Sequence, residues 1–248
     1  MFRTQRQSRH RQLVVQPLAA FAIALIGAAQ AGAADAATDK SDDGFVRLFE
    51  GDKDKVWIGY GKDTWPDGWE LSEGVLHRKS GGGDLQTVEE FGDFDLRFAW
   101  KIAPGGNSGV MYRVSRETGP AYATGAEYHL LDNAVHRDGK SPLTSAGALY
   151  GLYPPANDVV KPAGEWNRSR IVVQGHRVRH FLNGEKVVDA ELGGEDWNKR
   201  VAASKFAAWP KYGKNERGHV VLQDHGDEAW YRNMRIKRLD PAAQPVTK

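Results

Sequence analysis

The most constraining feature of this chain is an alternation of apolar and polar side chains with a period of two. The segment FDLRFAWKI places five apolar side chains on one face of an extended strand, namely Phe94, Leu96, Phe98, Trp100 and Ile102. Successive side chains of a β-strand point to opposite faces of its sheet. The segment therefore predicts a strand with one buried and one wetter face, in a sheet that needs a second layer.

The same period recurs along most of the chain, in SGVMYRVS, RSRIVVQG, HRVRHFLNGEKVVDAEL, GHVVLQDHG and AWYRNMRIKRL. Asn183-Gly184 separates two such runs and predicts a β-hairpin with a type I′ turn. The only helix candidate is the segment from Glu195 to Trp209. Ten or more short strands without long helices predict an all-β, jelly-roll-type β-sandwich of two antiparallel sheets, forming a single domain over residues 44–240.

The N-terminus has the composition of a secretory signal peptide. Four arginines and no acidic residue precede an apolar run of 12 residues, Leu18 to Ala29, and small residues follow. The run is shorter than the roughly 20 residues that span a bilayer. We therefore expect residues 1–33 to be a signal peptide, with cleavage after Ala31 or Ala33, and the protein to be periplasmic or secreted from a bacterium. An uncleaved single-helix anchor is the alternative.

The two ends of the chain and its net charge allow further predictions. Residues 34–43 are predicted to form a flexible leader and residues 241–248 a disordered tail. Loss of the four N-terminal arginines takes Lys+Arg from 34 to 30 against 32 Asp+Glu, so the formal charge changes from +2 to −2. This balance predicts no nucleic-acid partner. The signal prediction implies no stable membrane insertion after cleavage, and the absence of cysteine implies an ordinary core without disulfides.

Two strands place polar groups opposite their core faces. In AEYHLLD, Glu127 and His129 share a face opposite Tyr128 and Leu130, and we expect that face to be open and concave. A solvated outer face with no function is the alternative. In HVVLQDHG, Gln223 and His225 share the non-core face and Asp224 leads into a turn. This strand end predicts a site rim; a turn in which Asp224 caps local amides is the alternative.

Two further segments supply candidate ligand contacts. Asn107 lies in the glycine-rich loop PGGNSG, where a ligand can approach the backbone closely. Arg113 follows on the same strand as a forked donor for a sugar oxygen or an enolate, or as a partner for a nearby carboxylate. Lys205 lies in SKFAAWPKYGK, and Tyr153 in ALYGLYPP offers a flat ring for sugar stacking or for the core.

Several familiar chemistries are excluded. The sequence has no nucleophile elbow, P-loop, dinucleotide fingerprint or H-E-x-x-H motif. With no cysteine, thiol catalysis and thiolate metal sites are ruled out. No metal site is specified and no cofactor is required, but Glu127, His129 and His225 offer oxygen and nitrogen ligands for an optional divalent cation.

The segments GNSGVMYR, GAEYHLLDN, SAGALYGLYPP, SKFAAWPKYGK and GHVVLQDHGDEAWYRNMRIKRL together resemble the 3-keto-disaccharide hydrolase domain family. The likeness runs from Gly44 to Leu239. It implies a concanavalin A-like sandwich, usually exported, that acts on a small-molecule sugar glycoside oxidised at C3. Glu127 and the QDH run of Gln223, Asp224 and His225 match the family pattern. The family more often has glutamine at the position of His129, which argues against a catalytic role for His129 and leaves sugar binding as the role expected of it.

Cleavage of a 3-keto-glycoside by C2 proton abstraction, elimination and hydration needs a general base, an enolate stabiliser and an acid. Glu127, His225 and Lys205 are the candidate catalytic residues, with Glu127 or His225 as base and Lys205, Arg113 or a bound cation at the enolate. The candidate substrate-binding residues are Asn107, Arg113, His129, Tyr153, Gln223 and Asp224. A non-catalytic lectin-like module and a structural envelope protein are the competing functions. Convergence of the three catalytic candidates on one face would favour the enzyme.

Overall fold

The computed structural model describes Met1, residues 44–116 and residues 119–239. The predicted signal peptide, the leader and the predicted tail at 241–248 therefore lie outside the described residues, apart from Met1. In the described part no helix is long and apolar enough to cross a membrane.

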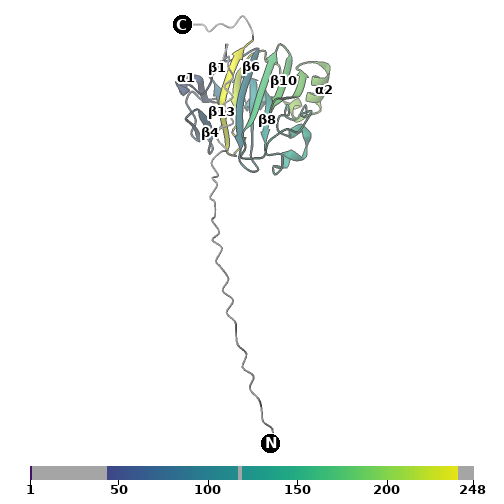
Figure 1. Cartoon of the computed structure of the whole chain (residues 1–248). Helices are drawn as coiled ribbons and strands as arrows, with labels where there is room; N and C mark the ends of the chain where they lie inside the picture. The colour runs from purple at the N-terminus through teal and green to yellow at the C-terminus, as the bar shows by residue number, and fades with distance from the viewer. Residues whose placement is uncertain (2–43, 117–118, 240–248) are drawn as a thin grey trace. The chain divides into compact units, whose positions relative to one another are not determined.

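Two antiparallel sheets make up the described domain (Figure 1). The larger sheet has eight strands and the smaller has five. The larger sheet contains β1 (Val46–Arg47), β3 (Trp69–Ser72), β4 (Val75–Arg78), β6 (Phe94–Ile102), β9 (Asn167–Gln174), β10 (Arg177–Leu182), β11 (Glu185–Glu191) and β13 (Ala229–Arg238). The smaller sheet has the order β2 (Trp57–Gly59), β5 (Leu85–Thr87), β12 (His219–Leu222), β7 (Asn107–Val114) and β8 (Ala126–Leu131). This arrangement confirms the predicted all-β sandwich.

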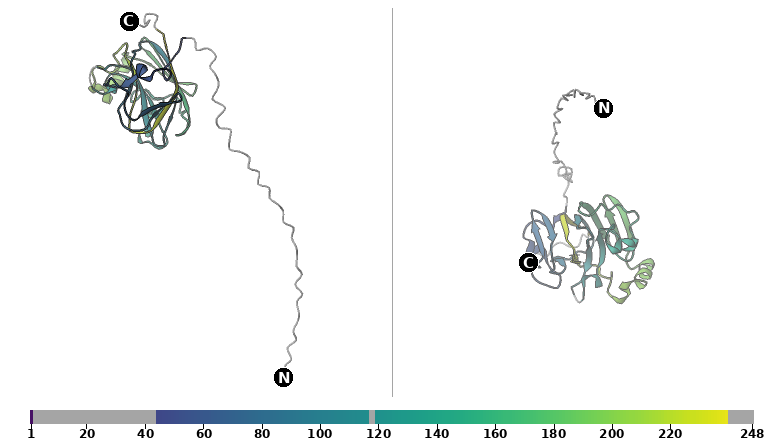
Figure 2. Two further views of the ribbon diagram at one scale, coloured as in Figure 1. Left: turned by 90° about the vertical axis from the view of Figure 1, so that its left-hand side faces the viewer. Right: turned by 90° about the horizontal axis from the view of Figure 1, so that it is seen from below.

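The core lies between the two sheets, which face each other as layers in the side view of Figure 2. The apolar face predicted for β6 is confirmed, because its five alternating side chains are all at most 3 % exposed. On the opposite face, Asp95 accepts hydrogen bonds from Arg97 and Arg170. The alternation read from the sequence therefore assigns the two faces of this strand correctly.

The predicted hairpin connects β10 to β11. Asn183 and Gly184 have φ values of +50° and +94°, as the two central residues of a type I′ turn require. Some of the other connections carry short helices, which are α1 (Lys53–Val56), η1 (Ala121–Ala123), η2 (Arg137–Lys140), η3 (Pro142–Thr144), α2 (Glu195–Ala202) and η4 (Lys205–Ala208).

The helix candidate between Glu195 and Trp209 is broken into α2 and η4. Ser204 stands at the break. Its hydroxyl donates to the Val201 carbonyl at 2.9 Å and accepts from the Phe206 amide at 3.1 Å, which ends one helix and caps the next. Because of this break, Lys205 starts a new turn.

Candidate functional site

The candidate site lies on the face of the five-stranded sheet that is turned away from the core, which we call the site face. Register places two rows of residues across it. Gln86 pairs with Val221, which pairs with Met111, which pairs with Glu127. In the next row Gly109 pairs with His129, and the Gln223 amide donates to the Gly109 carbonyl at 2.9 Å. Residues from four strands therefore meet side by side.

Glu127 leans from its own row across Gly109. A Cβ atom built on Gly109 would come within 2.2 Å of Glu127 Oε1, so the absent side chain leaves the space that the carboxyl group fills. Glu127 is only 4 % exposed. Burial raises its pKa to about 8, with Asp84 and Asp138 adding to the rise and the Lys205 charge opposing it. The carboxyl group is therefore mostly protonated at neutral pH.

The predicted open face around Glu127 and His129 is covered, and His129 is only 1 % exposed. Its Nδ1 lies 2.8 Å from the Thr144 carbonyl oxygen and its Nε2 3.0 Å from the Asn107 side chain. Burial lowers the pKa of His129 to about 3, so the ring is neutral. Since the Thr144 carbonyl only accepts, Nδ1–H of the neutral ring donates to it.

Lys205 is exposed at the start of η4 and faces the same group of residues. Its ammonium lies 4.3 Å from the centroid of the Tyr150 ring, which packs edge-on against His129 at 4.6 Å. The Lys205 charge lowers the pKa of both Glu127 and His129. The structure thus brings Lys205 into electrostatic contact with the buried carboxyl group, although the two residues are 78 positions apart.

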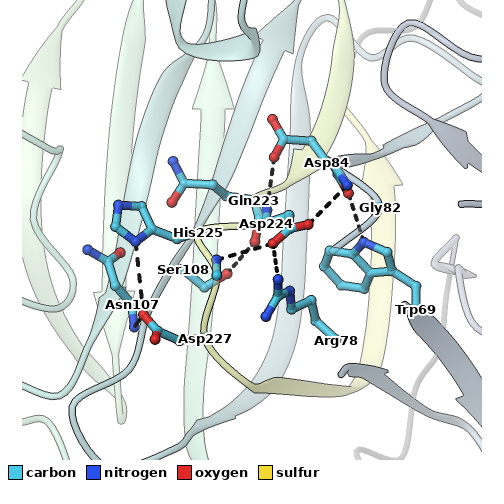
Figure 3. Close-up of polar contacts among 12 residues, drawn as sticks. Trp69, Arg78, Gly82, Asp84, Asn107, Ser108, Gln223, Asp224, His225 and Asp227 are labelled. Carbon is cyan, nitrogen blue, oxygen red and sulfur yellow. Dashed lines mark hydrogen bonds and ion pairs between the residues drawn. The ribbon is translucent and has the colours of Figure 1, made fainter. Parts of the chain in front are cut away.

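The QDH run after β12 divides its side chains between two directions (Figure 3). Gln223 and His225 point to one side, and Asp224 points the opposite way toward Arg78. Gln223 Oε1 is buried and has no hydrogen-bond partner among the described residues. This oxygen is therefore an unused acceptor beside Gly109.

The Asp224 carboxylate is held by an ion pair and by backbone hydrogen bonds. Arg78 Nη2 lies 2.5 Å from its Oδ1, with both side chains at most 7 % exposed, and the Gly83 and Gly226 amides donate to its carboxylate at 3.0 and 3.2 Å. The capping alternative from the sequence thus describes part of its environment. Direct contact of Asp224 with a sugar stays a prediction.

Asp84 is a site residue that the sequence reasoning missed. Its Oδ1 accepts from the Asp224 amide at 2.8 Å. Burial and the nearby Asp224 charge raise its pKa to about 6, against the effect of that hydrogen bond. Asp84 directly precedes β5, where Gln86 faces the same side and Leu85 enters the core. The sequence does contain a signal for this residue, because Asp84 and Gln86 are polar residues two positions apart that follow the glycines at 81–83.

His225 lies at the rim and is linked to the strands below it. Its Nδ1 is 3.9 Å from Asp227 Oδ2, which accepts from the Asn107 backbone amide at 3.0 Å. The ring is 6.2 Å from that of His136. Partial burial lowers the pKa of His225, so its half-exposed imidazole is neutral at neutral pH.

Arg113 and Tyr153 are placed apart from this group. Arg113 has φ +54° at an irregularity in β7, and its guanidinium donates to Asp93 and to the Gly92 carbonyl at 3.0 and 3.1 Å. It lines a different cavity, of about 570 Å³. Tyr153 stacks on Trp197 at 6.3 Å with Arg200 over its ring at 4.4 Å. Their substrate contacts stay predictions.

No group of three metal-ligating His, Asp or Glu side chains occurs in the part of the chain that the structure describes. Both ring nitrogens of His129 are already hydrogen-bonded. The optional divalent cation expected from the sequence stays a prediction.

Comparisons with known proteins identify the family of this chain. Residues 44–237 match the family model of the 3-keto-alpha-glucoside-1,2-lyase-like domain. A curated relative from Bacteroides thetaiotaomicron, named 3-keto-disaccharide hydrolase, is 34 % identical over 230 residues, which cover 80 % of this chain and 79 % of the relative.

Solved structures show the same fold. The structure of a candidate glycosyl hydrolase from Parabacteroides distasonis is 33 % identical, with a TM-score of 0.71 over 79 % of this chain and 94 % of that protein. A second such protein from the same organism is 24 % identical, with a TM-score of 0.62 over 79 % of this chain and all of that protein.

Proposed function

The chain belongs to the 3-keto-alpha-glucoside-1,2-lyase-like domain family, and from this membership we propose that it is a glycoside-cleaving enzyme acting on 3-keto-glycosides, 3-keto-disaccharides included. The observation that carries the proposal is the buried carboxyl group of Glu127, lying in the gap above Gly109 within reach of the Lys205 charge. A pKa near 8 suits proton transfer near neutrality, and a lectin has no need of such a group.

The reaction follows from the oxidised sugar. A ketone at C3 acidifies the proton on C2, so a base can remove it and leave an enolate. The enolate then expels the oxygen at C1, which takes up a proton as the C1–O bond breaks. Water adds across the resulting C1–C2 double bond, with its oxygen bonding to C1 and a proton returning to C2. The net change is hydrolysis of the glycosidic bond.

Three side chains can divide these steps. His225 is neutral at neutral pH and serves as the base for C2. Lys205 stabilises the enolate oxygen, because it is an exposed cation beside the site face. Glu127 is protonated and donates to the leaving oxygen. In the hydration step Glu127 takes a proton from water and His225 returns one to C2, which restores both groups.

The unused acceptor on Gln223 gives the sugar a fixed partner. A hydroxyl that donates to Gln223 Oε1 would lie next to Glu127, since Gln223 and the Glu127 carboxyl group flank the same Gly109. Export to the periplasm or the medium is part of the proposal, and it rests on the predicted signal peptide.

The test is turnover of a 3-keto-glucoside by the purified protein and by Glu127→Gln and His225→Ala. We expect each variant to lose about 10²- to 10⁴-fold in kcat, the range for one general acid or base. Glu191→Gln and His176→Ala, at exposed positions, are the matched controls. A parallel assay with chelator tests the optional cation. Normal turnover by both site variants would refute the roles, and binding without turnover would identify a sugar-binding module.

A further inference from the structure

A cavity of about 320 Å³ adjoins the site between η3 and η4. We call it the Tyr150 cavity. Its lining includes Tyr150 and Lys205, which also belong to the site, and none of Gln223, Asp224 or His225. The remaining lining residues are Leu143, Thr144, Gly151, Leu152, Arg200, Ala203, Ser204 and Phe206.

The polar side chains of this lining are mostly occupied by the protein. Thr144 Oγ1 donates to the Asp138 carbonyl at 2.6 Å. The Ser204 hydroxyl bonds to the backbone at Val201 and Phe206. Arg200 donates to Asp196 and to the Leu152 carbonyl at 2.7 and 3.0 Å. The remaining wall is therefore dominated by aliphatic and aromatic carbon.

Tyr150 and Lys205 are the exceptions. Within the described residues, neither the Tyr150 hydroxyl nor the Lys205 ammonium has a hydrogen bond or an ion pair. The Tyr150 hydroxyl and the Lys205 ammonium are too few to hydrogen-bond a hexose. Its several hydroxyls would lose their bound water without gaining partners. Each such hydroxyl would lie unpaired in the cavity, which opposes binding. A flat apolar ring would lose no hydrogen bonds and would gain contact with Leu143 and Phe206.

The cavity also adjoins the strand that carries the proposed acid. The Tyr150 amide donates to the Glu127 carbonyl at 3.0 Å, so the cavity wall is bonded directly to the strand that holds the proposed acid. An acid that protonates the C1 oxygen must contact that oxygen, and the aglycone begins there. A sugar over Gly109 with its C1 oxygen at Glu127 would then direct its aglycone toward Tyr150.

We propose that the Tyr150 cavity receives the aglycone and that it is matched to flat, apolar aglycones, such as aryl groups, in preference to a second sugar. This inference rests on the proposed function, because it assigns Glu127 to the leaving oxygen. It separates this chain from a strict disaccharide-cleaving enzyme by the chemistry of its leaving-group pocket.

The test compares 3-keto glucosides of 2-phenylethanol and methanol, two alkyl alcohols of similar acidity, together with a 3-keto-disaccharide. We expect kcat/KM to be at least tenfold higher for the phenylethyl substrate than for either of the others. Leu143→Asn removes apolar wall at a residue that is 38 % exposed. It should lower the phenylethyl-to-methyl ratio about tenfold. Val46→Asn, at an exposed position on β1, should leave that ratio as it is.

A ratio near one in the wild type, a preference for the disaccharide, or an unchanged ratio in Leu143→Asn would overturn the proposal. If no 3-keto-glycoside is cleaved, the proposed function fails instead. The cavity is then tested by calorimetric titration with 2-phenylethanol. Binding that Leu143→Asn weakens would support an apolar ligand site, and no binding, or equal binding by both proteins, would reject it.

Discussion

At the scale of single residues, Gly109 controls where the Glu127 carboxyl group lies. Gly109 does not have a left-handed backbone, so the strand itself would accept alanine, and the conflict is purely steric. We expect Gly109→Ala to push the carboxyl group off its place, to lower kcat at least a hundredfold, and to cost about 1–3 kcal/mol of stability from overpacking. Steady-state kinetics and urea unfolding measure the two effects.

A double-mutant cycle separates this contact from general damage to the strand. In a Glu127→Ala background the added methyl group meets no carboxyl group, so Gly109→Ala should cost clearly less stability than in the wild type. An equal cost in both backgrounds would show that the methyl group disturbs something other than Glu127.

Period-two reasoning placed Glu127, Gln223 and His225 on the face opposite the core because it assigns side chains to faces. It did not predict Asp84, which directly precedes a three-residue strand that is too short to show a period. It also predicted an open face for His129, which is buried. Which loop covers a strand depends on tertiary packing, here Thr144 and Tyr150 from a segment without strand periodicity.

At the scale of elements, one buried ion pair joins the two sheets next to the site. Arg78 ends β4 in the larger sheet, and Asp224 follows β12 in the smaller sheet. Removing one partner of a buried pair leaves the other charge unpaired, which costs about 3–5 kcal/mol. We expect Asp224→Ala to lose about that much stability in urea unfolding.

The double variant Arg78→Met/Asp224→Ala removes both charges and should recover much of the loss. If Asp224→Ala changes stability by less than about 1 kcal/mol and only raises KM, the Arg78–Asp224 pair does not stabilise the fold. The sequence-based expectation of a substrate contact would then describe Asp224 better.

The sheets themselves were predictable because alternation, the Asn183-Gly184 turn and the absence of long helices all indicate the same fold class. The pairing order was not, since β6 pairs with β9 and β13, far along the chain. Ion pairs such as Arg78–Asp224 depend on that order, so no local pattern reveals them.

At the scale of the whole molecule, buried titratable groups set the pH dependence of stability in opposing directions. Burial lowers the pKa of His129 and His180 to about 3. As the pH falls from about 6.5, these histidines bind protons in the unfolded chain but not in the native state, so stability is lost. Burial raises the pKa of Asp84 to about 6 and of Glu127 to about 8. The stability that these two carboxyl groups contribute is present at acid pH and is lost as the pH rises through these pKa values.

The two effects separate between pH 6.5 and pH 8. In the unfolded chain the histidines are half protonated at about pH 6.5 and nearly neutral by about pH 7.5, where Asp84 is ionised in both states, so toward pH 8 only Glu127 among these four groups still changes. We expect the free energy of unfolding to fall with pH in this window, by at most about 1.4 kcal/mol per unit for one proton. Glu127→Gln should flatten the slope and be more stable than the wild type at pH 8, whereas Glu191→Gln, at an exposed position, should keep it. Urea unfolding at half-unit steps measures this. The same slope in Glu127→Gln and the wild type would mean that Glu127 ionises freely in the native state, which would also remove its role as the acid.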